Sequence, residues 1–461
     1  TLKTGVYSLQ TESLVPFSAG SLNSISSQRI YHAISPKTGT LVFATSNGGV
    51  FITDTSGNLI QRFSKKEGLQ QNNVLCIFSD KQQNLWVGLD NGISCIAYNS
   101  AIKHISPTDQ ENAGYAAILH RDKLFIGTSG GVYSTPVLDK TDISFNTYPF
   151  EEVNNTAGQT WNLTELNGRL LMGHHEGAFE IENNNAKAFA SGAGYWNFIP
   201  TTSIFPAQTI VAGNYKGLTK INFDGKSFTE TLDIKGFEES SRFVAVDDKQ
   251  NYWVSHPYHG VYRIYRKSDS SYGAQQYDVK KGLPQLLNNH VYKIKNRILA
   301  ATPNGVFVYR SDKDIFEPEA ELNGLLGNIS VRVLKEDTEG NIWFIHDKCP
   351  GVIDFTEKKT RVIYVTELNN KLVSGFECIY AVDKNNIFLG SEKGFYHLNY
   401  DKYRKNRQPL VVHINSVSMH NQKDIMLFGG HYHSLFEKQI QPDSAVFSIP
   451  YSWNSLVISY A

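Results

Sequence analysis

Ten side chains in short polar segments of the chain could bind a ligand. In these segments aromatic residues stand beside asparagine, histidine and arginine. Aromatic faces supply contact area for the apolar side of a sugar ring, and the polar groups fix the orientation of its hydroxyls. The candidate ligand-binding residues are Trp161, His174, His175, Trp196, Tyr215, Arg242, His256, Tyr258, Asn289 and His346.

Other chemistries lack the residue patterns they need. His174 and His175 are adjacent and His431 and His433 alternate, but neither pair has a third ligand at a metal-binding spacing. The chain has no Gly-x-Ser-x-Gly elbow for a nucleophilic serine. No pair of carboxylates stands out for glycoside cleavage. We therefore expect no catalytic residue, no metal ligand and no cofactor.

The composition predicts folded domains with a sizeable core. Of 461 residues, 41% are hydrophobic, 12% aromatic and only 19% charged, the opposite of a disordered segment. Lys and Arg balance Asp and Glu at 44 each, and no basic stripe stands out, so direct contact with nucleic acid is not expected. The apolar runs are too short to cross a bilayer. Cys76, Cys95, Cys349 and Cys378 have no metal or redox spacing and are expected to be buried.

A repeat supplies the elements that must position these residues. Apolar residues, a small residue, several polar residues and then a glycine recur along the chain, as in LWVGLDNGI over residues 85–93. A period in the low forties with four short strands per unit is the signature of β-propeller blades, so we predict an all-β propeller fold. The marking glycines stand at positions 5, 49, 92, 131, 177, 217, 260, 305, 351 and 394.

One repeat can be divided into its strands. A six-residue spacing from Asp80 to Trp86 marks the turn before the second strand, and we expect this tryptophan to pack between blades. The glycine after the second strand is expected to let neighbouring blades approach closely. Blade geometry then brings the ten candidate residues to one mouth of the ring. The predicted strands, from the innermost outwards, are Val74–Phe78, Leu85–Gly88, Ile93–Ala97 and Ile102–Ile105.

The segment GLQQNNVLCIFSDKQQNLWVGLDNGI at residues 68–93 resembles the two-component-regulator propeller (Reg_prop) repeat. The resemblance covers essentially the whole chain and is most specific at 68–93, 241–262 and 331–352. Such repeats fill the periplasmic sensor regions of hybrid two-component regulators and of LuxR-type one-component regulators. The resemblance implies seven-bladed propellers followed by a triple-tyrosine (Y_Y_Y) β-sandwich that leads to the membrane.

The repeat spacing and the tail predict three parts. Seven glycine motifs counted back from the last give a seven-bladed ring over residues 106–405, so residues 1–105 would be the last blades of a first propeller. A single larger ring is the alternative. Residues 406–461 resemble the N-terminal part of the triple-tyrosine, Ig-like sandwich, with strand-like runs at 409–417 and 452–460. We expect a fragment of a longer protein whose C-terminal continuation reaches the membrane.

The resemblance implies a periplasmic, non-enzymatic ligand sensor in a bacterial inner-membrane regulator of transcription or signalling. A carbohydrate or other small molecule would bind at the ring mouth. The sandwich of a homodimer would then pass the change to a cytoplasmic kinase or DNA-binding domain. Two alternatives stay open: a lyase or glycoside hydrolase that acts on polysaccharide, and a scaffold or adhesion propeller. The candidate residues could also be ordinary polar loops with packed aromatic side chains.

Overall fold

The computed structural model describes residues 5–405, apart from 18, 19, 37, 38, 109, 147, 203 and 204, and beyond them residues 412, 414–419, 425–429 and 455–460. The chain divides into two compact units, Thr1–Tyr403 and Arg404–Ala461. The described secondary structure is mostly antiparallel strand, which confirms the all-β propeller prediction. The short α-helices are α1 (Leu22–Ser27), α2 (Ala320–Leu326) and α3 (Tyr400–Lys405).

Seven four-stranded antiparallel sheets make up the larger part of the first unit. The first three sheets contain β11 (Gly114–His120), β12 (Lys123–Thr128), β13 (Val132–Pro136) and β14 (Glu151–Glu152); β15 (Thr160–Leu166), β16 (Arg169–His174), β17 (Gly177–Glu182) and β18 (Asn185–Ser191); and β19 (Tyr195–Pro200), β20 (Thr209–Asn214), β21 (Gly217–Phe223) and β22 (Phe228–Asp233). The next three contain β23 (Phe243–Val246), β24 (Tyr252–His256), β25 (Gly260–Arg266) and β26 (Tyr272–Tyr277); β27 (His290–Ile294), β28 (Arg297–Thr302), β29 (Gly305–Arg310) and β30 (Ile315–Pro318); and β31 (Val333–Glu336), β32 (Ile342–His346), β33 (Cys349–Asp354) and β34 (Arg361–Tyr364). The seventh contains β35 (Ile379–Asp383), β36 (Asn386–Ser391), β37 (Gly394–Leu398) and β10 (Ile102–Ile105).

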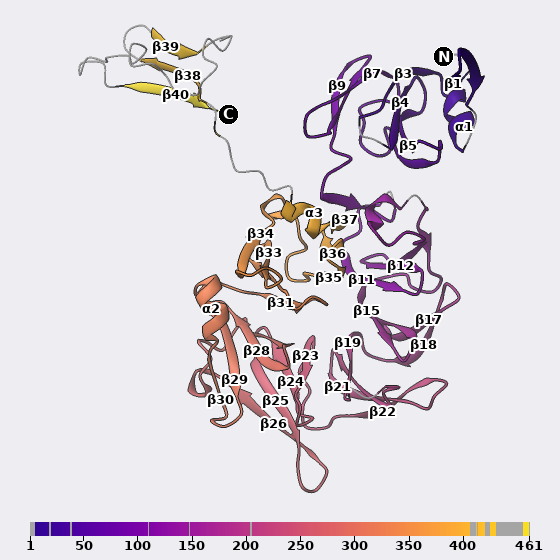
Figure 1. Cartoon of the computed structure of the whole chain (residues 1–461). Helices are drawn as coiled ribbons and strands as arrows, with labels where there is room; N and C mark the ends of the chain where they lie inside the picture. Colours follow the sequence, from indigo (N-terminus) through magenta and orange to yellow (C-terminus); the bar gives the residue numbers. More distant parts are fainter. Residues whose placement is uncertain are drawn as a thin grey trace. The chain divides into compact units, whose positions relative to one another are not determined.

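The seventh sheet closes the ring with a strand from far earlier in the chain. β10 pairs with β37, Ile102 opposite Leu398 and Ile105 opposite Phe395. The prediction that Ile102–Ile105 is the fourth strand of the preceding blade is therefore wrong. β10 thus gives the seventh sheet the outermost strand that the other six sheets also have, and its pairing with β37 joins the two ends of the ring. Figure 1 shows the first strands β11, β15, β19, β23, β31 and β35 around the centre of the ring. Neighbouring first strands contact one another from β11 through β31, and β11 also contacts β35.

Apolar clusters join each sheet of the ring to the next. The last joins the seventh sheet to the first, where Phe388 and Phe395 pack with Leu124 and Ile126. Two second-strand glycines make this approach possible. A Cβ at Gly213 would lie 1.9 Å from the Ser241 carbonyl oxygen of the next sheet, and one at Gly390 would lie 2.3 Å from the Gly114 carbonyl oxygen. The small residue inside the second strand thus allows the close approach between these blades. The glycine after the second strand is confined as well, since a Cβ at Gly217 would lie 2.6 Å from the Phe237 carbonyl oxygen in the loop that leads to the fourth sheet.

Two further sheets precede the ring. They contain β3 (Ile30–Ile34), β4 (Thr40–Thr45), β5 (Gly49–Asp54) and β6 (Leu59–Phe63), and β7 (Val74–Ser79), β8 (Leu85–Leu89) and β9 (Gly92–Ile96), after a hairpin of β1 (Tyr7–Gln10) and β2 (Ser13–Pro16). One face of β7–β9 packs on the neighbouring sheet through Val74 and Val87. The opposite face exposes Phe78, Trp86 and Ile93 to solvent.

The burial predicted for the cysteines is wrong at two positions. Cys76 and Cys95 are exposed on the open face of β7–β9, and Cys349 and Cys378 are half-buried. All four thiols are free. These strands are nearly continuous apolar runs, which is the pattern of a sheet covered on both sides, but in the described residues only one side is covered.

The C-terminal unit contains one three-stranded sheet in its described residues. Its strands are β38 (Ile414–Met419), β39 (Ile425–Gly429) and β40 (Leu456–Tyr460), in the order β39-β38-β40. β38 and β40 overlap the two strand-like runs of the sequence. The Ig-like sandwich and the tyrosine triad stay predictions.

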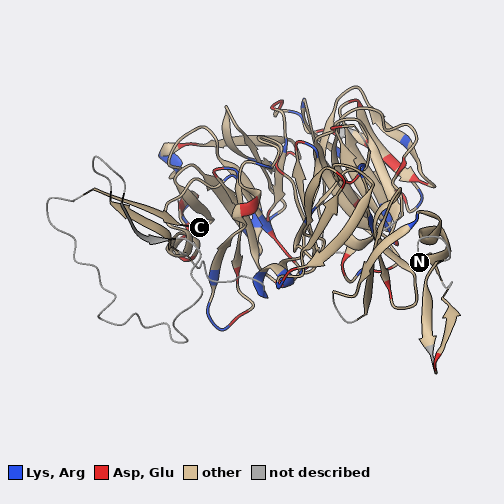
Figure 2. Ribbon diagram, turned by 90° about the horizontal axis from the view of Figure 1, so that it is seen from above, with Lys and Arg blue, Asp and Glu red and all other residues tan. Residues whose placement is uncertain are grey.

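Charge is distributed evenly over the described sheets. Figure 2 shows Lys and Arg interspersed with Asp and Glu. Several of these charges pair directly, as where Arg263 and Lys281 both contact the Asp314 carboxylate at 2.8 and 2.7 Å. Among the described residues, no helix is both long and apolar enough to cross a membrane.

Candidate functional site at the ring mouth

A β-bulge at the same place in three first strands positions an aromatic side chain at the ring mouth. The pairing of the first strand with the second shifts by one residue in β11, β15 and β19. The residue left without a partner is Tyr115, Trp161 and Trp196, respectively. A β-bulge leaves its extra residue out of the ladder and changes the direction of its side chain. The bulges therefore direct three large rings out of the sheets at equivalent positions.

These rings pack together with Tyr215 and Phe376, and we call the five residues the mouth cluster. The ring centroids of Trp161 lie 4.9 Å from Trp196, 5.1 Å from Tyr115 and 5.1 Å from Phe376. Trp196 lies 4.9 Å from Tyr215. Phe376 precedes β35 of the seventh sheet, so the mouth cluster joins side chains of four sheets. It is an aromatic platform built by the ring as a whole.

Hydrogen bonds hold the indoles of the mouth cluster in place. Trp161 Nε1 donates to the Tyr215 hydroxyl at 2.8 Å, and Trp196 Nε1 donates to Ser240 Oγ at 3.0 Å. Burial raises the pKa of both Tyr115 and Tyr215. The Tyr215 hydroxyl accepts from Trp161 and so keeps its own proton for a ligand acceptor. At 37% exposure, Tyr215 is the most accessible phenol of the platform.

Arg242 lies over the platform from the fourth sheet. Its guanidinium carbon is 4.3 Å from the centroid of Phe376 and 5.6 Å from that of Trp196, and it donates to the Gly375 carbonyl. Burial lowers the pKa of Arg242. A cation above aromatic faces is attracted by their π-electrons, more strongly where water is excluded.

Charged residues occupy the matching positions of the sixth and seventh sheets. Arg332 directly precedes β31, as Arg242 precedes β23, and Glu377 lies just before β35. Arg332 and Glu377 form an ion pair at 3.4 Å, with the Glu377 side chain only 6% exposed. One side of the mouth is thus aromatic, and the other carries guanidinium and carboxylate groups.

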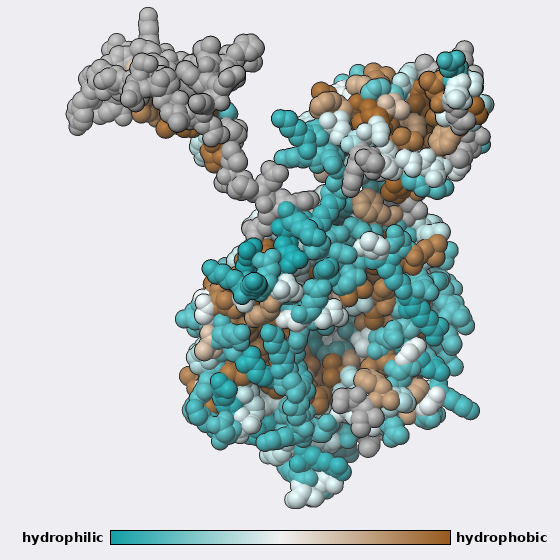
Figure 3. Space-filling view, in the orientation of Figure 1, coloured by the Kyte–Doolittle hydropathy of each residue, from teal (hydrophilic) through white to brown (hydrophobic). Residues whose placement is uncertain are grey.

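A cavity of about 880 Å³ runs along the innermost strands β19, β23, β27 and β31. Arg242 lines it, as do Tyr292, Lys293, Lys335 and Glu336. Figure 3 shows the hollow at the centre of the ring, with hydrophobic side chains in its wall. The centre of the ring is therefore large enough for a small ligand and has both apolar and charged walls.

The other predicted residues do not join the mouth cluster. His174 and Asn289 are buried, and Asn289 Nδ2 donates to the Gln285 carbonyl at 2.7 Å, so it shapes a loop. Burial lowers the pKa of His174. His175 Nδ1 accepts from Gln159 N at 3.1 Å, and His346 Nδ1 lies 2.8 Å from the Ser330 carbonyl.

His175 and His346 have the same structural role in two sheets. His175, in the turn after the second strand, and His346, the last residue of the second strand, each contact the loop that leads into the first strand of their sheet. His256 and Tyr258 lie on the corresponding turn of the fourth sheet, where Tyr258 is 71% exposed. Burial lowers the pKa of His256, and the nearby His259 lowers it further. His431 and His433 lie outside the described residues.

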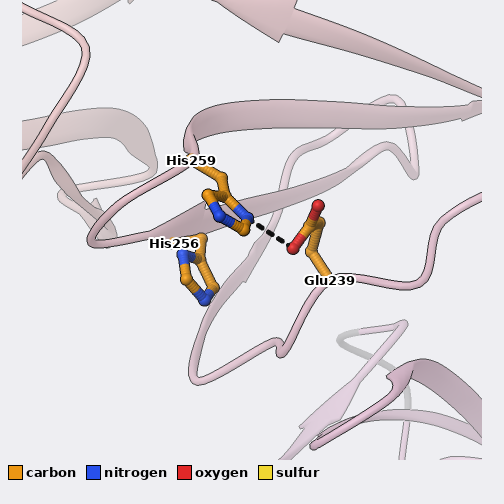
Figure 4. Close-up of side chains that lie close together, drawn as sticks. All are labelled: Glu239, His256 and His259. Atoms are coloured by element: carbon orange, nitrogen blue, oxygen red, sulfur yellow. Dashed lines mark hydrogen bonds and ion pairs between the residues drawn. The ribbon is translucent and has the colours of Figure 1, made fainter.

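Sequence reasoning missed Tyr115, Phe376, Arg332 and Glu377 at the mouth. A usable signal was present, because each stands at or just before the innermost strand of its sheet, as Trp161 and Trp196 do. It also missed the proximity of Glu239 to His256 and His259, which only the packed loops reveal (Figure 4).

Comparisons with known proteins support the fold. A family model described as "Two component regulator propeller" matches residues 68–91. No curated protein matches the sequence significantly. One similar solved structure is the extracellular domain of BT3049 from B. thetaiotaomicron, which is assigned to a hybrid two-component system. It superposes with a TM-score of 0.66 at 18% sequence identity, and the match covers 99% of this chain and 61% of that domain. The chain thus spans about three fifths of that domain.

Two weaker superpositions involve other propellers. The extracellular domain of BT4673 from B. thetaiotaomicron, assigned to a one-component system, gives a TM-score of 0.48 at 12% identity over 91% of this chain and 57% of that chain. Inactive virginiamycin B lyase from Staphylococcus aureus gives 0.46 at 11% identity over 64% of this chain and 98% of that chain. The chain is a β-propeller protein that carries a two-component-regulator propeller repeat at residues 68–91.

Proposed function

We propose that the chain is the periplasmic ligand-sensing region of a bacterial transmembrane regulator, without enzymatic activity of its own. The observation that carries the proposal is the mouth cluster. Side chains of four sheets form this aromatic side of the ring mouth, and charged side chains form the other side. The repeat at residues 68–91 and the extracellular two-component domain with the same fold support the sensing role.

The ligand that fits this mouth is a saccharide. Its apolar ring face stacks on Trp161 or Trp196, where the half-buried indoles offer rigid area at little entropic cost. Its hydroxyls accept from Tyr215 and Arg332 and donate to Glu377. Stacking without specific polar contacts would bind many apolar molecules, so the charged half of the mouth supplies the selectivity.

Signalling requires that the ligand prefers one arrangement of the protein over another. Only differential affinity for two states moves an equilibrium between them. We propose that the C-terminal unit, as part of a triple-tyrosine sandwich in a homodimer, passes this preference through the membrane to a kinase or DNA-binding domain.

A thermal-shift screen with plant and host oligosaccharides tests the binding role. A ligand at a hundredfold excess over its Kd stabilises the folded state by about 2.7 kcal/mol, a readily measured rise in Tm. Tyr215→Ala should weaken binding about tenfold, because the loss of one hydrogen bond from the phenol to the sugar costs about 1.4 kcal/mol. Tyr148→Ala is the matched control, since Tyr148 is similarly exposed (45% against 37%) but lies away from the mouth cluster.

The same screen separates the sensor from its rivals. New reducing ends or unsaturated sugars in the incubated samples would identify a hydrolase or lyase and overturn the proposal. A chain that no saccharide stabilises would support a scaffold propeller instead.

A further inference from the structure

Three potential metal ligands converge beside the ring mouth, as Figure 4 shows. Glu239, His256 and His259 each offer one donor atom, and the three atoms lie within 4.8 Å of one another. His259 Nδ1 is 2.6 Å from Glu239 Oε2, and the two imidazole rings stack with centroids 4.3 Å apart. In the part of the chain that the structure describes, this is the one group of three such residues.

The backbone around these residues is fixed from several sides. His256 and His259 are the ends of the turn between β24 and β25, closed by a hydrogen bond from His259 N to the His256 carbonyl at 3.3 Å. Asn288 N of the next loop donates to the Pro257 carbonyl at 2.8 Å. The Glu239 carbonyl accepts from Ser241 Oγ at 2.9 Å, and Ser241 is buried. The two loops therefore present the donors from supported positions.

The donor set suits a particular class of metal ion. Two imidazole nitrogens and one carboxylate oxygen form a set that Zn²⁺ and its neighbours prefer, with the fourth tetrahedral position left for water or substrate. Zinc ligands at about 2.0–2.2 Å from the metal are roughly 3.3–3.6 Å apart. The His259–Glu239 contact must open by less than about 1 Å to reach that spacing, which side-chain rotation can supply.

Metal binding would replace two hydrogen bonds. The contact between His259 and Glu239 would give way to two metal–ligand bonds. His256 Nδ1 accepts a long hydrogen bond from Tyr258 N at 3.2 Å, which must also be lost because a neutral imidazole has a single free lone pair. The metal position between these side chains is open to solvent, since the side chains of His259 and Glu239 are 50% and 37% exposed.

We propose that Glu239, His256 and His259 bind a divalent transition-metal ion of the zinc class with one open coordination position. The site is distinct from the mouth cluster, although the adjacent Ser240 accepts the hydrogen bond from Trp196 Nε1. A bound ion would order the loop that carries both Glu239 and Ser240.

Calorimetric titration of the chelator-treated 461-residue chain with Zn²⁺ tests this site. We expect one ion per chain, and Co²⁺ in its place should give the visible absorption of a four-coordinate site. His256→Gln, His259→Gln and Glu239→Gln should each weaken Zn²⁺ binding by at least about tenfold. Circular dichroism would verify that each variant folds.

The chain offers a matched control for the carboxylate. Glu165 accepts from His120 Nδ1 at 2.7 Å and its side chain is 45% exposed, but among the described residues no second histidine is grouped with this pair. Glu165→Gln should therefore leave Zn²⁺ affinity unchanged. Equal affinity for the wild type and the folded double variant His256→Gln/His259→Gln would overturn the proposal, and so would the absence of a one-to-one Zn²⁺ transition in the wild type.

Discussion

At the scale of single residues, one motif has two different environments. Trp86, Trp253 and Trp343 each donate from Nε1 to an aspartate six positions earlier, at 3.1, 2.9 and 3.0 Å. Trp253 and Trp343 are completely buried, because the next sheet packs on them, whereas Trp86 is 44% exposed. The local turn is thus encoded by the motif itself, and burial depends on the neighbouring sheet.

The sequence pattern predicted the aspartate–tryptophan turns and the presence of Trp161 and Trp196 near the mouth. It could not predict the mouth cluster, because β-bulges depend on how two strands pair and leave no periodic signal. His174 and Asn289 are buried, and His174 Nδ1 and Asn289 Nδ2 make contacts within their loops, so their assignment as ligand-binding residues stays a prediction.

The buried His290 should make the ring sensitive to acid. Burial lowers its pKa to about 3, and the charges of Arg332 and Arg242 act in the same direction. The unfolded chain binds a proton below about pH 6.5, while the folded chain does not until about pH 3. Stability should therefore fall as the pH drops through this window, by at most about 1.4 kcal/mol per pH unit.

Denaturant unfolding of His290→Asn at several values between pH 4 and pH 8 checks this prediction. The variant should show a shallower loss of stability on acidification than the wild type, whatever its stability at neutral pH. The exposed His104 provides the control, and His104→Asn should follow the wild-type curve. An unchanged slope for His290→Asn would contradict the assignment.

At the scale of elements, ring closure is the feature that local patterns describe least well. The short apolar runs Val74–Phe78 and Leu85–Gly88, separated by turn residues, predicted strands that the structure contains as β7 and β8. The same reasoning assigned Ile102–Ile105 to the adjacent sheet, because the sequence order favours the nearest partner. β10 instead pairs with the edge of β37, which only the seventh sheet of the closed ring presents to it. This pairing is a property of the complete ring.

A designed disulfide tests the pairing of β10 with β37. His104 lies opposite Tyr396, and their rings contact at 5.2 Å, so both side chains point to the same face. Opposed antiparallel residues lie about 4.5–5.5 Å apart at Cα, within the range that a disulfide spans. His104→Cys/Tyr396→Cys should form a 104–396 bond on mild oxidation, identified by mass spectrometry of peptides.

The single variant His104→Cys serves as the control for that disulfide. It should stay reduced in the monomer. A bond between position 104 and the native Cys95 would show that β10 lies beside β9 instead.

At the scale of the whole molecule, the open face of β7–β9 needs a partner. Phe78 (66%), Trp86 (44%) and Ile93 (73%) are exposed, whereas Trp253 and Trp343, which are equivalent to Trp86 in sheets of the ring, are completely buried. We propose that β3–β9 are the closing blades of a first propeller and that a further blade covers this face.

The central claim is that the mouth cluster receives the sensed ligand. Hydrogen–deuterium exchange of the chain, with and without the saccharide that gives the largest rise in Tm, tests it most directly. We expect slower exchange in peptides around Trp161, Trp196, Arg242 and Phe376, with β7–β9 unchanged. Protection confined to other parts of the chain, or no protection at the mouth under saturating ligand, would contradict it.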